Sequence, residues 1–101
     1  MMSLKIEQSA KYRGDDWWEW AVWVGGAPDE LERVDYVRYT LHSTFPNPVR
    51  TIRDRATQFR LETAGWGVFR IYALVVFKDG EHLNLRHDLE LLYDDGTPTS
   101  A

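Results

Sequence analysis

Residues 68–77, with the sequence VFRIYALVVF, decide the fold class of this chain. Apolar side chains recur there at every second position, and one face collects Phe69, Ile71, Ala73, Val75 and Phe77. A period of two is typical of a β-strand with a buried face, whereas an amphipathic helix needs a period near 3.6. An Asp-Gly pair at positions 79–80 follows the segment and predicts a hairpin turn.

Further strands are predicted on both sides of this hairpin. Residues 82–92 form its partner strand, with one face of Leu83, Leu85, His87, Leu89 and Leu91. Residues 17–24 read WWEWAVWV, so Trp18, Trp20, Val22 and Val24 share one face. Shorter strands are expected at 4–8, 33–41 and 58–62, and a single helical turn at 29–33. The sum is an all-β, immunoglobulin-like β-sandwich of about seven to eight antiparallel strands.

The length and composition indicate one domain in a reducing compartment. The chain has 101 residues and no cysteine, so it forms neither a disulfide nor a thiolate metal site. We expect a single domain over residues 1–93 and a frayed polar tail over 94–101. The first residues lack the apolar core of a signal peptide, and no apolar run reaches the ~20 residues of a membrane span. The chain is therefore expected to be cytoplasmic, with no membrane partner, and to be a piece of a larger protein or a domain by itself.

Catalytic, cofactor and metal sites are not predicted. The serines lack the context of a nucleophile, and no His–carboxylate pair has a plausible catalytic spacing. His82 and His87 are five residues apart on one strand and face opposite sides of it. The net charge of −4 disfavours a dedicated nucleic-acid binder, although Arg50, Arg53, Arg55 and Arg60 form a local basic run that suits an acidic partner.

Two loops carry the strongest functional signal. Residues 41–50 read LHSTFPNPVR and residues 64–69 read AGWGVF. Each loop places an aromatic residue, Phe45 or Trp66, beside small or hydroxyl residues. Two such aromatics on neighbouring loops of a sandwich can hold a flat, uncharged group between their faces. Alternatively, both rings cap the core at one end of the sandwich.

The two loops closely resemble the signature of the YEATS domain family, and the short length resembles its prokaryotic branch. The resemblance runs from about Glu19 to Leu91 and rests on His42-x-Thr44-Phe45-Pro46-x-Pro48 followed by Gly65-Trp66-Gly67. It implies an immunoglobulin-like sandwich that binds acylated lysine, including the acetyl and crotonyl forms, in a protein or peptide partner.

The resemblance also implies a role for each loop residue. Phe45 and Trp66 become the aromatic walls, and either Trp17 or Trp18 supplies a further pocket aromatic. His42 lies at the pocket floor, and Thr44 offers its hydroxyl to the acyl-amide or, alternatively, caps the turn before Pro46. The backbone N–H of Trp66 donates to the acyl carbonyl, while Gly65 and Gly67 let the main chain come close.

A second reading of the chain remains open. In it the sandwich has lost acyl-lysine binding and recruits a protein partner through an edge strand or through the sheet face that carries Trp17 and Trp23. The Trp content alone suggests a carbohydrate-binding module, which the missing secretion signal disfavours. The sequence favours no oligomeric state, acyl group or target protein.

Overall fold

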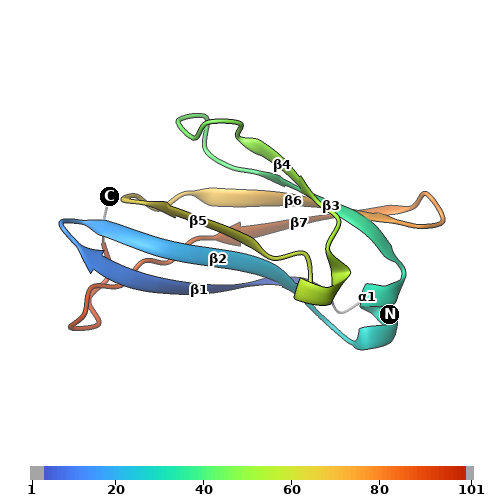
Figure 1. Cartoon of the computed structure of the whole chain (residues 1–101), viewed down its shortest axis with the longest axis horizontal. Helices are drawn as coiled ribbons and strands as arrows, with labels where there is room; N and C mark the ends of the chain where they lie inside the picture. Colours follow the sequence, from blue (N-terminus) through green and yellow to red (C-terminus); the bar gives the residue numbers. More distant parts are fainter. Residues whose placement is uncertain (1–3, 100–101) are drawn as a thin grey trace.

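Two antiparallel β-sheets pack face to face in the computed structural model, which describes residues 4–99 (Figure 1). The three-stranded sheet has the order β1 (Lys5–Gly14), β2 (Trp17–Gly25), β5 (Leu61–Gly65). The four-stranded sheet has the order β4 (Val49–Ile52), β3 (Val34–Thr40), β6 (Arg70–Phe77), β7 (His82–Asp88). Two single-turn helices, α1 (Pro28–Glu32) and the 3₁₀ turn η1 (Arg55–Thr57), connect strands. The predicted all-β sandwich is confirmed, with seven strands.

The core lies between the sheets and follows the alternation of the sequence. In β2, Trp18, Trp20, Val22 and Val24 are buried, and in β6 the buried residues are Ile71, Ala73, Val75 and Phe77. Each large apolar side chain removed from water in this way contributes about 1.5–3 kcal/mol to stability. Within residues 4–99, no helix has the length and apolar character needed to cross a membrane.

The segment before β5 corrects the strand expected at 58–62. Gln58 and Phe59 have φ values of 60° and 59°, the left-handed region that strands avoid, so β5 begins only at Leu61. Phe59 is completely buried, and its carbonyl accepts a 2.7 Å hydrogen bond from the Tyr39 hydroxyl. Burial raises the pKa of that hydroxyl far above its ordinary value, so Tyr39 remains a donor. The buried ring and this bond offset the strained backbone.

Both ends of the described chain also differ from the sequence prediction. Strand β1 runs over ten residues instead of the expected 4–8. Residues 94–99 are not frayed, since Tyr93 N–H donates to Thr97 O at 2.8 Å and Thr99 N–H donates to Leu91 O at 3.0 Å. The C-terminal segment therefore folds back as a small hydrogen-bonded turn. Residues 1–3, the start of the chain considered for a signal peptide, and 100–101 lie outside the described residues.

One glutamine side chain links the edges of the two sheets. Gln8 of β1 donates from Nε2 to Glu90 O at 2.8 Å, and its Oε1 accepts from Glu90 N–H at 2.9 Å. The same oxygen lies 2.7 Å from His87 Nε2. Because an amide oxygen only accepts, Nε2 of His87 carries the proton in this bond. The Gln8 side chain thus connects β1 to the segment that follows β7 through hydrogen bonds.

We predict that acidification destabilises the fold through His87. Burial lowers the pKa of His87 below its ordinary 6.5, an effect that the charges of Glu90 and Asp88 partly offset. The unfolded chain then binds more protons than the folded chain below about pH 6.5, so stability falls as the pH drops through that range. Denaturant unfolding between about pH 7 and pH 5 measures this slope. His87→Gln should flatten the slope, and an unchanged slope in that variant would contradict the assignment.

Candidate functional site

Three connections lie at one end of the sandwich (Figure 1), and residues of two of them, together with the ends of β2 and β5, line a pocket. They are the β3–β4 loop (41–48), the β5–β6 loop (66–69) and the β1–β2 turn (15–16). The pocket has a volume of about 360 Å³, within the range of small-ligand sites. Its lining residues are Trp17, His42, Thr44, Phe45, Pro46, Ala64, Gly65, Trp66, Gly67, Val68 and Phe69.

The β3–β4 loop is held by hydrogen bonds rather than by strand pairing. Leu41 N–H donates to Pro48 O at 2.8 Å and closes the loop at its base. The Arg50 guanidinium then donates to Pro46 O at 2.9 Å and to Asn47 O at 3.0 Å. Asn47 lies in the left-handed region with φ 49°, which Asn tolerates well. Arg50 therefore fixes the part of the loop that two prolines exclude from a β-ladder.

Phe45 and Trp66 differ in how firmly they are held. Phe45 is half-buried, and its ring lies 5.3 Å from the Phe69 ring and 6.2 Å from the Trp20 ring, both measured between centroids. Trp66 is 61% exposed. One aromatic of the pocket is thus part of the edge of the core, while the other extends into solvent from a Gly-Trp-Gly loop.

His42 and Thr44 form a polar pair at the pocket. The His42 Nδ1 and the Thr44 Oγ1 are 2.9 Å apart, and the Thr44 backbone N–H donates to the same Nδ1 at 3.3 Å. Because Nδ1 accepts from the backbone, neutral His42 carries its proton on Nε2. Both residues are exposed, so His42 lies nearer the rim than the floor that the resemblance implied. The Thr44 hydroxyl pairs with His42 instead of capping the turn before Pro46.

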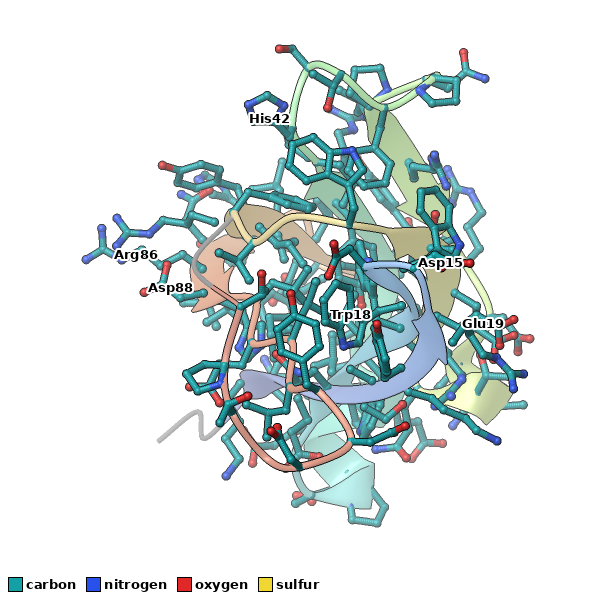
Figure 2. The ribbon with its side chains drawn as sticks, turned by 90° about the vertical axis from the view of Figure 1, so that its left-hand side faces the viewer. Asp15, Trp18, Glu19, His42, Arg86 and Asp88 are labelled. Atoms are coloured by element: carbon teal, nitrogen blue, oxygen red, sulfur yellow. The ribbon has the colours of Figure 1, made fainter. Side chains whose placement is uncertain are left out.

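The two adjacent tryptophans are separated by the alternation of β2. Trp17 is 45% exposed and lines the pocket. Trp18 is fully buried, and its Nε1 donates to Leu92 O at 2.8 Å; Figure 2 shows it inside the sandwich, away from His42. Trp18 is therefore wrong as a pocket aromatic, because the period of two turns its ring into the core.

Two glycines bring the β5–β6 connection close to the pocket. Gly65 is buried and pairs with Trp18 of β2. A Cβ on Gly65 would lie 3.5 Å from Phe45 Cζ, so the main chain here approaches the Phe45 ring directly. Gly67 also lines the pocket.

Four lining residues had not been predicted as site residues. Phe69 is the most important of them, because its ring contacts both Phe45 and His42, with centroid distances of 5.3 and 6.1 Å. The sequence contained a signal for this residue, since Phe69 is the first apolar residue of the alternating run that continues into β6, just after the Gly-Trp-Gly loop. Pro46, Ala64 and Val68 complete this set.

Among residues 4–99, no Asp, Glu, Lys or Arg lines the pocket. The site therefore suits an uncharged group, and it offers no carboxylate that could replace the water around an ammonium ion.

The arginines of the basic run predicted from the sequence largely pair with residues outside the pocket. Arg53 pairs with Asp35 at 3.4 Å, and Arg60 pairs with Glu62 at 3.1 Å and lies over the Trp23 ring.

Comparisons with known proteins identify the family of this chain. A family model described as the prokaryotic YEATS domain matches residues 18–90. Transcription initiation factor TFIID subunit 14 of Schizosaccharomyces pombe is 39% identical over 64 residues, which cover 61% of this chain and 26% of that protein. The chain thus spans about a quarter of the length of that relative.

Solved structures of the yeast protein Yaf9 share the fold. The Yaf9 YEATS domain bound to H3K27ac superimposes with a TM-score of 0.73 at 26% identity, covering 98% of this chain and 80% of that one. The Yaf9 YEATS domain recognizing an H3K122suc peptide gives 0.67 at 29% identity, covering 95% and 72%. These structures belong to a family of non-catalytic readers. The matched segment covers most of the sandwich and both loops of the pocket, and this chain belongs to the prokaryotic YEATS domain family.

Proposed function

We propose that this domain is a non-catalytic module that binds acylated lysine, of the acetyl or crotonyl type, in the pocket between its two loops. The observation that carries the proposal is an uncharged pocket of about 360 Å³ with a half-buried Phe45 on one loop and an exposed Trp66 on the other. The structural relatives support it, because Yaf9 binds H3K27ac and an H3K122suc peptide.

The chemistry of the pocket favours acyl-lysine over lysine. Acylation removes the positive charge and leaves a planar amide with an apolar cap. A planar amide stacks well on aromatic rings, and a conjugated acyl group extends the stacked surface. An unmodified ammonium group would lose its hydration with no acid among the lining residues to compensate.

Three polar groups of the site would bind or orient the acyl-amide: the Thr44 hydroxyl, the Trp66 backbone N–H and the His42 imidazole. The Thr44 hydroxyl donates to His42 Nδ1, which leaves its lone pairs to accept the N–H of the acyl-amide. The backbone N–H of Trp66 donates to the acyl carbonyl, which needs a donor once water is excluded. His42 thereby acts mainly by orienting Thr44 at the rim.

A docking role for the outer face of the three-stranded sheet has less support. Trp17 lines the pocket at the end of that face. Trp23 is half-buried beneath Arg60, whose guanidinium carbon lies 5.0 Å from the ring centroid, and its Nε1 donates to Glu7 at 3.0 Å. The Trp23 ring, on which this alternative partly rests, is therefore already covered within the domain.

The direct test is a titration followed by amide chemical shifts, using lysine peptides that carry no acyl, an acetyl or a crotonyl group. We expect saturable binding of the acylated peptides alone. Trp66→Ala should weaken it about tenfold or more, because it removes one aromatic surface of the pocket. It should leave the unfolding free energy nearly unchanged, since Trp66 is 61% exposed.

The matched control is Tyr72→Ala. Tyr72 is 53% exposed on β6 and does not line the pocket. This variant should bind acylated peptides like wild type. Equal loss of peptide affinity in both variants would contradict the proposal. So would the absence of chemical-shift changes at millimolar peptide with folded protein, and either result would favour the protein-docking alternative.

The loop geometry leads to a second prediction, for Arg50→Ala. Removing the guanidinium deletes both hydrogen bonds to the carbonyls of Pro46 and Asn47, so the loop tip should become mobile. Backbone relaxation and hydrogen exchange of residues 43–47 measure this, and affinity for acylated peptides should fall with it. Arg55→Ala, in the 3₁₀ turn, removes the same charge and should change neither. Equal loop order in the two variants would show that Arg50 does not hold the loop.

A further inference from the structure

A second hollow lies on the outer face of the three-stranded sheet and adjoins the pocket. It has a volume of about 570 Å³ and is lined by residues of all three strands. Ala64 lines both the hollow and the pocket. Trp17, which lines the pocket, shares its face of β2 with Glu19 and Ala21 of the hollow. The two depressions are therefore continuous along one surface of the domain.

The floor of the hollow is formed by the central strand and one of its neighbours. Ala21 of β2 pairs with Ser9 of β1, and alternation turns both side chains outward. Ser9 is exposed, whereas Ala21 is only 3% exposed because longer side chains rise around it. A chain that leaves the pocket at Ala64 can thus continue across this face without displacing a core residue.

Four charged side chains line the hollow, and three of them have partners within the domain. Glu19 pairs with Arg13 at 2.8 Å, and Arg60 pairs with Glu62 at 3.1 Å. Lys11 is the fourth. It is exposed and, within residues 4–99, its ammonium group forms neither an ion pair nor a hydrogen bond. The charge that the hollow leaves uncompensated is therefore positive, which suits a carboxylate on a ligand.

Lys11 lies a short peptide length from the pocket. Lys11 and Ala64 both pair with Glu19, so they lie two strands apart on the same row of the sheet. Neighbouring strands are about 4.8 Å apart, so the two Cα atoms are separated by roughly 10 Å, which about three residues of extended chain span. A peptide whose acyl-lysine fills the pocket can therefore bring its third neighbour to Lys11.

The geometry points to Lys11 as a specificity-determining residue for the peptide that carries the acyl-lysine. The segment that flanks the acyl-lysine lies in the hollow, and a carboxylate about three residues away pairs with the Lys11 ammonium group. This inference rests on the proposed acyl-lysine function and adds the chemistry of the partner. The preferred ligand is an acylated segment with an acidic residue at that spacing.

The test compares crotonyl-lysine with blocked ends and longer crotonyl-lysine peptides. The peptides carry Asp, Ala or Lys at the third position before or after the modified residue. On the flank that lies in the hollow, we expect the Asp peptide to bind about two- to fivefold more tightly than the Ala peptide, the range of an exposed ion pair. The Lys peptide should bind more weakly than both. Salt screens exposed charges, so these differences should shrink as the ionic strength rises.

The decisive variant is Lys11→Glu, which should make the Lys peptide the tighter ligand. It should leave the Kd of blocked crotonyl-lysine unchanged, because Lys11 does not line the pocket. The matched control is Lys78→Glu, which makes the same change of charge at an exposed position between β6 and β7. Lys78→Glu should keep the wild-type order of the three peptides.

Amide chemical shifts locate the flanking segment directly. The amide resonances of Ser9 and Ala21 in wild type should move when the Asp peptide binds and stay in place with blocked crotonyl-lysine. If Lys11→Glu does not fold, these resonances decide the question.

Two results would overturn the inference and leave the proposed function intact. One is saturable binding of blocked crotonyl-lysine with equal Kd values for the Asp, Ala and Lys peptides on both flanks. The other is a preference for the Asp peptide that persists in Lys11→Glu, because another cation would then be responsible. Absence of binding by blocked crotonyl-lysine and by every crotonyl peptide would overturn both the inference and the proposed function.

Discussion

The packing of the Trp20 indole against Phe45 and Phe69 connects the core of this sandwich to its pocket. Trp20 is fixed by the alternation of β2, which is the central strand of its sheet and pairs with both neighbours. Phe45 rests on that indole although it belongs to a loop. The position of one wall of the pocket is therefore set by core packing, which makes it stiff, while Trp66 on the other loop is held by no comparable burial.

The composition of the two loops explains why, in the described part of the chain, no acidic or basic side chain other than His42 lines the pocket. Two prolines and two glycines keep the loops out of the ladders, and Arg50 satisfies loop carbonyls from outside the pocket. Among the lining side chains, those of His42 and Thr44 form a polar pair with each other. A lining of this composition disfavours ions through desolvation and suits a planar amide through stacking, and this is the physical basis of the proposed selectivity.

Much of this architecture could be predicted from the sequence, because the alternation in β2 and β6 reports burial directly. The two loops were predictable from their proline, glycine and aromatic spacing. The start of β5 was not, since the left-handed conformations of Gln58 and Phe59 depend on the buried Phe59 ring and the Tyr39 hydroxyl, which are tertiary contacts. The turn at 94–99 was missed for a similar reason: its polar composition resembles a tail, and only its hydrogen bonds back to residues 91 and 93 order it.

The pocket was only partly predictable for geometric reasons. Alternation places Trp17 and Trp18 on opposite faces, but it does not say that the start of β2 lies beside the two loops. Phe69 was assigned to the core face, and it does face inward, yet it also reaches the pocket because the sandwich ends at that position. Residues at the ends of a sandwich serve the core and the site together, and a period of two does not distinguish these roles.

The most direct test of acyl-lysine binding in this pocket is to locate a crotonyl-lysine peptide on the domain through intermolecular nuclear Overhauser effects. We expect contacts from the crotonyl protons to the ring protons of both Phe45 and Trp66, with the peptide backbone outside the pocket. Contacts confined to residues away from this end of the sandwich, such as Tyr72 on the outer face of the four-stranded sheet, would contradict it.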